Sequence, residues 1–457
     1  MSETDIHHGG DDDTSPDATP APDTTLGSSY YKLFAGTIVS NLGDGMATVA
    51  YPWLASAITR NPILIALVAV AQRLPWLLFT LPAGVITDRV DRRKAMVSMD
   101  VLRGLFTLLV AFAVLGKQGV LPGPDEVDTV IGTETGLYLL VLLATLLLGM
   151  AEVLRDNSNQ TIMPDIVRPD QLEKANGRIW SVEMVTNTLV GPPLGSLLLL
   201  VAFSLPFFVD AATFFVAAAL VFSIPGTFRA ERDDDAPVQT FRQDLGEGVR
   251  WLMGHSLLRP MAIILGLLNG AGMISGAVIV LFAQEVLDIG PFLFTVLFFG
   301  GAAGGLIGGN LAPAISKRLG SGTSLAVALG GLAVSSLVVG LVPWWPLVIV
   351  MFGVNSFLGI LWNVITVSLR QTIIPNRMLG RVNSVYRFFA WGMIPIGAAL
   401  GGVLVWIVER QVDRDWALRS TWFAEALVIT GCFVFGRAKL TTEKMEAARA
   451  AATASSS

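Results

Sequence analysis

Ionisable residues within long apolar segments are the part of this sequence whose chemistry stands out. A charge in hydrocarbon is unfavourable, so such residues usually pair with one another or face a water-filled path, and each is a candidate functional residue. A carboxyl group in a low-dielectric cavity holds a proton more readily than in water, and it can exchange that proton when its access alternates between two sides. The residues concerned are Asp44, Arg73, Arg103, Glu152, Arg155, Asp156, Glu183, Asp210, Arg387 and Glu425.

Among these residues, Glu152 and Glu183 are the carboxyl groups that we expect to carry a coupling proton. Glu152 and Arg155 lie three residues apart on one helix face, so they could pair, and Arg155 could equally pair with a neighbouring helix. Asp44 and Asp210 lie near the ends of their apolar segments, where a structural role competes with a functional one. For each of these residues, the alternative is an ion pair that only stabilises the protein.

The remaining reactive residue types predict no metal site, no cofactor and no enzyme active site. His7, His8 and His255 are too few and too scattered for a metal site, and Cys432 is the only cysteine. The sequence contains no P-loop and no arrangement of nucleophile and base. We therefore expect a proton gradient, rather than ATP or a cofactor, to supply the energy.

The composition indicates that membrane-spanning helices hold these charges. Of the 457 residues, 53% are hydrophobic and only 15% are charged, and the mean hydropathy is +0.62. A soluble domain carries about a quarter charged residues, and a spanning helix needs roughly 20 mainly apolar ones. About twelve segments qualify, at residues 30–57, 62–87, 95–115, 136–159, 175–199, 204–225, 259–284, 291–315, 323–342, 346–371, 382–407 and 418–437. We predict an all-α polytopic membrane protein with twelve transmembrane helices.

A short charged loop between the second and third segments predicts their direction. Basic residues are retained on the cytoplasmic side, and this loop holds Arg89, Arg92, Arg93 and Lys94. With the loop inside, the other inside connections are also richer in Lys and Arg than the outside ones. The pattern predicts a multi-pass protein of the cell (cytoplasmic) membrane with both termini in the cytoplasm.

The sequence also repeats itself, which predicts two halves of six helices each. Gln160-Thr161-Ile162-Met163-Pro164 recurs six segments later as Gln371-Thr372-Ile373-Ile374-Pro375. Halves of this kind are related about the membrane normal in one class of transporters, with the substrate path between them. The predicted organisation is a disordered tail at 1–28, a bundle at 29–225, a linker at 226–258 with an amphipathic surface helix, a bundle at 259–438 and a tail at 439–457.

The loop Gly84-x-x-x-Asp88-Arg89-x-Asp91-Arg92-Arg93-Lys94 closely resembles the signature between spans two and three of the major facilitator superfamily. Asp91 stands where much of that superfamily has glycine, a variant similar to its drug and siderophore exporter branch. Other segments that resemble this branch are Ser40–Asp44, Met163–Asn176, Phe207–Asp210, Asp244–Leu258 and Ile374–Asn383. The resemblance covers about residues 30–437 and implies the superfamily's fold of two pseudo-symmetric six-helix halves.

In that superfamily the loop acts as a conformational latch that holds the two halves together on the cytoplasmic side. The resemblance implies this role for Gly84, Asp88, Arg89, Arg92 and Arg93. Asp88 can accept hydrogen bonds from the N-terminus of a second-half helix, and we expect Arg92 to pair with Asp156. The alternative is that the loop is only a topology signal.

Gly191-Pro192-Pro193-Leu194-Gly195-Ser196, in the fifth segment, resembles the Gly-Pro-rich motif that marks exporters within the superfamily. The match is partial, because Asn187 stands at a position where the full pattern has glycine. The resemblance implies that Gly191, Pro192 and Gly195 contribute to export. Proline also bends helices by removing a backbone donor, so a plain kink is the alternative.

An apolar and aromatic cavity with a few amides would suit a bulky, amphipathic and cationic substrate. The residues that we expect to line it are Trp53, Trp76, Asn187, Asn269, Asn355, Trp362 and Asn363. The leading hypothesis is a monomeric, proton-coupled antiporter that exports drugs or a small metabolite by alternating access, with the lipid bilayer, the substrate and protons as partners and no nucleic acid. The alternative is a proton-coupled uptake symporter on the same fold. A membrane enzyme or a non-transporting receptor has no supporting site in the sequence.

Overall fold

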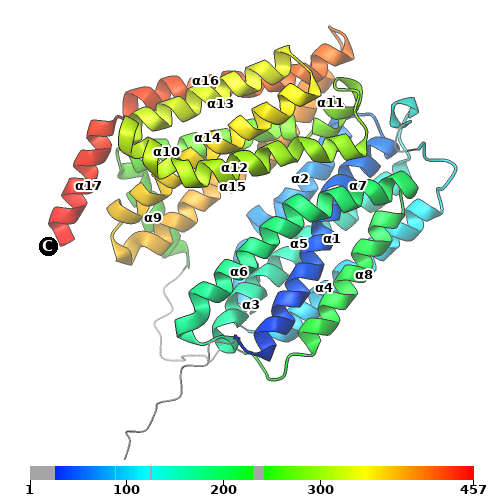
Figure 1. Cartoon of the computed structure of the whole chain (residues 1–457), viewed down its shortest axis with the longest axis horizontal. Coiled ribbons are helices and arrows are strands. Elements are labelled where there is room, and N and C mark those ends of the chain that lie inside the picture. Colours follow the sequence, from blue (N-terminus) through cyan, green and yellow to red (C-terminus); the bar gives the residue numbers. More distant parts are fainter. Residues whose placement is uncertain (1–25, 88, 124–125, 230–240, 457) are drawn as a thin grey trace, which may run out of the picture.

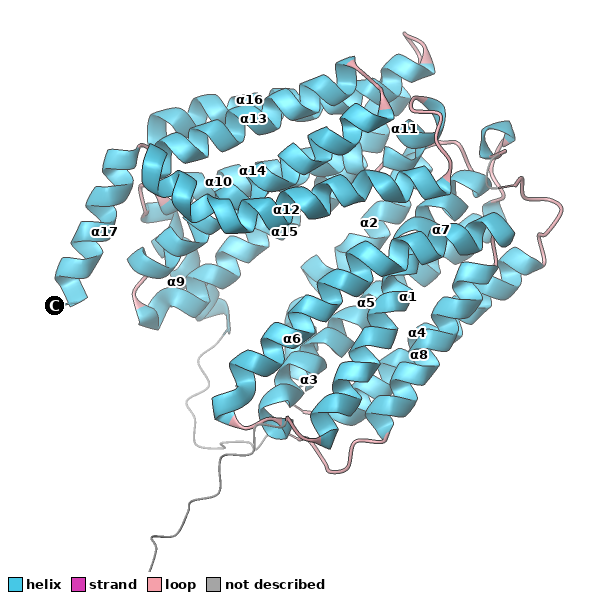
Figure 2. Ribbon diagram, in the orientation of Figure 1, coloured by secondary structure: helices cyan, strands magenta, loops and turns pink. Residues whose placement is uncertain are grey.

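The computed structural model describes residues 26–87, 89–123, 126–229 and 241–456, which form two groups of long helices (Figures 1 and 2). Among these residues, 10 helices are long and apolar enough to cross a membrane. Two further spans complete twelve: α1 (Ser28–Ile58), and the broken pair of α2 (Pro62–Leu78) and α3 (Thr80–Thr87). The predicted all-α fold of twelve spans in two halves is confirmed.

The N-terminal half contains the first six spans. After α1 and α2–α3 come α4 (Arg92–Leu115), α5 (Thr135–Ile166), α6 (Leu172–Met184) and α8 (Leu205–Phe222). Between α6 and α8 the fifth span continues through a π-helical segment, η3 (Val185–Val190), into α7 (Gly191–Val201). Short 3₁₀ turns, η1 (Val127–Thr129) and η2 (Pro169–Gln171), lie in the connections.

The C-terminal half contains the other six spans. They are α10 (Leu258–Gly276) with α11 (Ile279–Glu285), α12 (Pro291–Leu319), α13 (Ser321–Leu341), α14 (Trp345–Ile373), α15 (Asn376–Val408) and α16 (Arg414–Lys439). A helix of the linker, α9 (Phe241–Gly254), packs against α10 and α15. The segment 439–457, predicted as a tail, contains α17 (Thr442–Ser456), which packs on α13 and α14. Its alanine-rich sequence favours a helix, and fully buried Met445 anchors it.

Short polar residues define where several helices begin. The side chain of Asn61 accepts a hydrogen bond from the backbone N–H of Ile63 (2.9 Å), and Pro62 then opens α2. Asp91 caps α4 in the same way, by accepting from the N–H of Lys94 (3.2 Å). Both residues satisfy backbone donors that a helix start leaves unpaired. The aspartate that distinguishes this loop from the commoner glycine variant therefore has a local role as a helix cap.

Within each half, small residues allow helices to approach closely, as expected where lipid removes the hydrophobic drive between helices. The clearest case is α12 against α14. A Cβ atom added at Gly304 would lie 1.9 Å from the carbonyl oxygen of Gly353, so only glycine permits this contact. The resulting packing leaves large apolar side chains such as Leu306 and Ile307 on the outer surface, where lipid would cover them.

The two halves touch at one end of the molecule and separate toward the other (Figure 1). The main contacts between them are those of α2 with α15 and of α7 with α12. The closed end is the end where the halves touch; it is formed by the α1–α2 turn, the end of α11 and the α15–α16 connection. We call the opposite end the open end. At Leu78 the second span breaks, and α3 then packs against α5 of its own half rather than against α15.

Candidate functional site

A polar cavity of about 330 Å³ lies within the N-terminal half. Its lining comes from α1, α2, α4, α5, the fifth span and α8, so every span of this half contributes. The charged residues that line it are Asp44, Arg73, Arg103, Glu152, Arg155, Asp156, Glu183 and Asp210. This lining contains five carboxyl groups and three guanidinium groups, an acidic excess of two. Of the ten intramembrane charged residues named from the sequence, these eight lie at this one cavity. Arg387 and Glu425 belong to the C-terminal half, where Glu425 is buried and accepts hydrogen bonds from Ser275 and Ser336.

A chain of buried ion pairs forms one wall of the cavity. Asp100 on α4 is fully buried and lies 3.3 Å from the Nε of Arg155 and 3.7 Å from the Nη1 of Arg103. Arg103 also pairs with Asp44 of α1, and its guanidinium group stacks on the ring of Phe214 at 4.0 Å. Of the two predicted alternatives for Arg155, the structure therefore shows pairing with a neighbouring helix and not with Glu152. The ion pairs join α1, α4 and α5, and the contact of Arg103 with Phe214 adds α8.

Glu152 and Glu183 stand apart from this ion-pair chain. Within the described part of the chain, neither side-chain carboxyl group has a hydrogen bond or a cation within 4 Å, although both residues line the cavity. Asp210 is 3% exposed, and its Oδ1 atom has no hydrogen-bond partner among the described residues. The cavity thus offers acidic groups that are not already neutralised by an arginine. Such groups can bind either protons or a cation.

A second cavity, of about 380 Å³, adjoins the first and lies between the two halves. The two share lining residues that include Tyr51, Gln72, Arg73 and Asn187. The C-terminal half adds an apolar wall, which contains Met273, Ala277, Val280, Phe294 and Phe298. One side of the combined space is therefore polar and acidic, and the other side is apolar and aromatic.

Only one of the seven residues predicted as cavity lining takes that position. Asn187 lines both cavities and donates to the Oδ1 of Asn41 at 2.6 Å. Trp53 and Trp362 are instead buried in packing, with Trp53 against Phe294 at 5.3 Å between ring centroids. Their size and apolarity place them in the protein core, because burying a large ring is favourable wherever it fits.

The other four predicted lining residues also lie elsewhere. Asn269 donates to the backbone carbonyl of Ala390 at 2.7 Å and so joins α10 to α15. Trp76 packs against Trp391 at 5.6 Å between centroids, a contact between the two halves. Asn355 is half-buried on α14 and Asn363 is exposed there, and neither lines the two cavities.

The Gly-Pro segment of the fifth span forms a close contact with α1. A Cβ atom at Gly191 would lie 2.6 Å from the Cα of Gly45, and one at Gly195 would lie 2.7 Å from the carbonyl oxygen of Met46. Pro192 lines the cavity between the halves, directly after the π-helical segment. The helix distortion and the close contact therefore occur together, where the polar cavity meets the second half.

Among its described residues, the charged loop after α3 makes its polar contacts within the first half and its linker. Asp88 lies outside the described residues. Arg92 does not pair with Asp156: its Nη1 contacts the Oδ2 of Asp165 at 2.6 Å and the carbonyl oxygen of Thr161 at 3.0 Å. The reason is the length of α5, which runs to Ile166 and brings Asp165 level with the start of α4, while Asp156 lies more than two turns back, at the cavity.

The other predicted latch residues lie in the same region. Arg93 donates to the backbone carbonyl of Ile224 at 2.5 Å, and the carbonyl of Arg89 accepts from Arg229 of the linker. Gly84 leaves room beside it, since the nearest atom to an added Cβ would be the Nδ2 of Asn157 at 3.8 Å.

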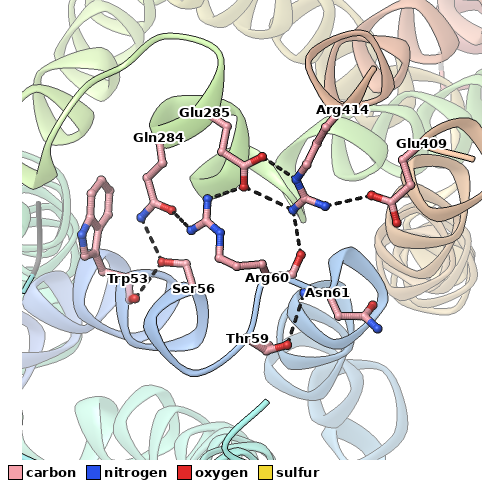
Figure 3. Close-up of polar contacts among 9 residues, drawn as sticks. All are labelled: Trp53, Ser56, Thr59, Arg60, Asn61, Gln284, Glu285, Glu409 and Arg414. Atoms are coloured by element: carbon pink, nitrogen blue, oxygen red, sulfur yellow. Dashed lines mark hydrogen bonds and ion pairs between the residues drawn. The ribbon is translucent and has the colours of Figure 1, made fainter. Parts of the chain in front are cut away.

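A polar network joins the two halves at the closed end (Figure 3). Glu285, at the end of α11, pairs with Arg60 from the α1–α2 turn and with the Nε of Arg414 from α16 at 2.5 Å. Arg414 also contacts Glu409 at 2.8 Å and donates to the carbonyl oxygen of Arg60 at 2.7 Å. Gln284 adds hydrogen bonds to Arg60 and to Ser56, the latter at 2.9 Å. We call these residues the closed-end network.

Comparison with known proteins identifies the family of this chain. A model of the transmembrane secretion effector family, part of the major facilitator superfamily, matches residues 27–455. The chain belongs to this family. It is therefore a multi-pass membrane transporter, and not an enzyme.

Two curated relatives of this transporter are named as efflux proteins. The multidrug efflux pump Tap of Mycolicibacterium fortuitum is 25% identical over 395 residues, which cover 83% of this chain and 90% of Tap. The enterobactin exporter EntS of Escherichia coli is 26% identical over 390 residues, covering 82% of this chain and 85% of EntS.

Solved structures show the same fold at lower identity. The nucleoside transporter NupG aligns with a TM-score of 0.65 and 12% identity, over 90% of this chain and 99% of NupG. A bacterial homologue of the iron transporter ferroportin, in an inward-facing state, aligns with a TM-score of 0.63 and 17% identity, over 90% of this chain and 98% of the homologue.

Sequence reasoning missed several residues of this transporter that matter to the site. Asp100 is the centre of the ion-pair chain. Its position three residues before Arg103 could have predicted this pairing, because residues at that spacing share a helix face. Gln72 and Tyr51, which line both cavities, are single polar groups without a motif. Glu285 and Gln284 end a span, where a polar residue is ordinary, so nothing in the sequence marked them.

Proposed function

We propose that this transporter exports cationic, amphipathic molecules across the cell membrane in exchange for protons, by alternating access. The observation that carries the proposal is the cavity lining, in which Glu152 and Glu183 face the space without a partnered cation. A cationic group would be attracted to these carboxylates, and the apolar wall with Met273 and Phe298 would hold the rest of the molecule. Binding of a proton and of a cation at the same carboxylates would be mutually exclusive, which is what exchange requires.

The direction of transport is supported by topology and by the relatives. Both curated relatives described above are named for efflux. The open end carries the basic loops, so the positive-inside rule favours the cytoplasm on that side and puts both termini there. On this reading the described conformation is open to the cytoplasm, where the cavity would collect its substrate.

The closed-end network would serve as the outer gate. Its ion pairs connect α1–α2 of one half to α11 and α16 of the other, and they would have to break for the cavity to open outward. The charged loop Gly84–Lys94 is the corresponding element of the open end, and we propose that it forms contacts with the second half in the outward-open state. Both conformations would be accessible to a monomer, and the proton gradient and substrate would bias their populations.

The test is accumulation of fluorescent cationic dyes, macrolides and siderophores in cells that express the protein, with and without a protonophore. We expect lower accumulation of the cationic compounds than in cells with an empty vector, and loss of that difference when the protonophore is added. Higher accumulation that depends on the gradient would instead establish uptake by symport. An unchanged difference in the presence of the protonophore would contradict proton coupling.

A further inference from the structure

A concave pocket at the open end lies outside the transport path and has a cationic rim. It measures about 900 Å³ and lies between the start of α10, the end of α16 and helix α17. Arg259, Lys439 and Lys444 contribute its charges, and no Asp or Glu of the described residues lines it. Arg259 donates to the carbonyl oxygen of Met253 and Lys444 to that of Ala438, but within the described residues none of the three has a carboxylate within 4 Å, so their charges are not neutralised.

His255 adds a hydrogen-bond donor of fixed tautomer to the same pocket. Its Nδ1 atom accepts from the backbone N–H groups of Leu257 and Leu258, both at 3.2 Å, and so caps the start of α10. That arrangement leaves the ring hydrogen on Nε2. Burial lowers the pKa of His255, which keeps the ring neutral and preserves the cap near neutral pH.

The opposite wall of the pocket is apolar and made of small side chains. Ala447, Ala448, Ala451 and Ala452 recur at helical spacing along one face of α17, and Phe435 of α16 lies beside them. Alanine leaves a groove where longer side chains would fill the space. The pocket therefore combines a cationic and hydrogen-bonding rim with an apolar channel.

The position of the pocket identifies what would meet it. Leu258 is the first residue of α10 and Lys439 the last of α16, so the pocket lies where two spans leave the hydrocarbon. Phosphate groups of lipids occupy this level, and basic pockets there attract anionic headgroups. Acyl chains begin immediately below and match the alanine groove.

From these observations we propose that the pocket binds an anionic phospholipid of the leaflet at the open end, with the phosphate on Arg259, Lys439 and Lys444 and an acyl chain along α17. The site lies apart from the polar cavity and does not depend on what the transporter exports. A bound lipid would hold α17, which packs mainly on α13 and α14 and reaches α16 through Lys444, against the ends of α10 and α16.

The test is native mass spectrometry of the full-length protein in detergent, titrated with phosphatidylglycerol, phosphatidylcholine or inorganic phosphate. We expect a tight phosphatidylglycerol adduct in the unmodified protein, weakened at least tenfold in Lys439→Ala/Lys444→Ala. The matched control is Lys317→Ala/Arg318→Ala, which removes two cations from the end of α12 at the same end of the molecule and should leave binding unchanged.

A second variant separates a lipid from a free phosphate. Ala451→Trp keeps every charge but fills the groove, so it should weaken phosphatidylglycerol binding and not phosphate binding. Equal phosphatidylglycerol affinity in all variants would overturn the proposal. So would an Ala451→Trp variant that binds both inorganic phosphate and phosphatidylglycerol as well as the unmodified protein does. Equal binding of phosphatidylcholine would do the same, because that headgroup has no net charge.

Discussion

At the scale of single residues, the cavity separates two kinds of buried charge. Asp44, Asp100, Arg103 and Arg155 neutralise one another across α1, α4 and α5. Glu152 and Glu183 lie at the same cavity without such partners. We propose that the first group holds the half together and that the second exchanges a proton. The two groups therefore predict different consequences of substitution.

Glu183→Gln removes a proton-binding group without changing the size of the side chain. We expect the variant to be expressed and folded but to lose the dependence of transport on the pH gradient, since an amide cannot take up a proton. Substrate flux into everted vesicles at several pH gradients measures this. The conservative variant Glu183→Asp should restore part of the dependence, and full gradient dependence in Glu183→Gln would remove this residue from the coupling site.

Asp100→Asn leaves two buried guanidinium groups without their shared carboxylate. Removing one member of a buried ion pair destabilises a protein by about 3–5 kcal/mol, so thermal unfolding in detergent should occur at a clearly lower temperature. Asp165→Asn is the control, because its carboxylate pairs with Arg92 and is 39% exposed, where a pair contributes little. Equal melting temperatures for the two variants would contradict the structural role of Asp100.

The residue scale also shows how far the sequence could predict the site. Apolar segments made the intramembrane charges visible, so Asp44, Glu152, Glu183 and Asp210 could be named in advance. Their partners could not, because pairing depends on how each helix is rotated about its axis. Trp53 and Trp362 show the same limit: a large ring in a span suits a cavity wall and a packed core equally well, and only the packing decides.

At the scale of helices, the fifth span combines a π-helical segment with a close approach to α1. The lengths and apolarity of the spans predicted most helices well, whereas the π segment η3 and helix α17 have no signal of comparable strength. The alanine-rich sequence favours a helix at α17, but the helix also needs a packing contact, which buried Met445 provides. The close contact of Gly195 with α1 explains why the Gly-Pro motif contains glycine, which a proline kink alone would not explain.

Gly195→Ala tests whether the close contact between α7 and α1 is needed for transport. The added Cβ would lie 2.7 Å from the carbonyl oxygen of Met46, so α7 and α1 would have to move apart. We expect a marked loss of transport with the protein still inserted in the membrane. Gly177→Ala, earlier in the same span, is the matched control because nothing lies within 4 Å of its added Cβ. Equal transport by the two variants would mean that the close contact has no part in function.

At the scale of the whole molecule, two halves meet at the closed end through the closed-end network and separate beyond Leu78. The network is only partly exposed, with side-chain exposures of 13% for Arg60 and 17% for Glu285. Ion pairs shielded in this way are screened less by salt than surface pairs. The repeat and the basic loops predicted two halves and their direction, but the ends of α11 and α16 meet only in three dimensions.

Glu285→Gln should weaken this closure and shift the protein toward an outward-open state. The measurement is labelling of a cysteine introduced at Thr48, which lines both cavities, with an impermeant maleimide from the side of the closed end. We expect faster labelling in Glu285→Gln than in the parent, while the native Cys432 is buried. Glu134→Gln is the control, since its partner Lys117 belongs to the same half, and identical rates in both variants would argue against a gate.

The central claim is that cationic substrate and protons exchange at the carboxyl groups of one cavity. The direct test uses everted membrane vesicles whose interior is acidified by respiration. A dye that is quenched at low internal pH reports the proton gradient, and a cationic substrate is then added. Proton-coupled export predicts immediate dequenching with the unmodified protein, as protons leave in exchange for substrate, and none with Glu152→Gln/Glu183→Gln. Substrate uptake into these vesicles without any dequenching would contradict the claim.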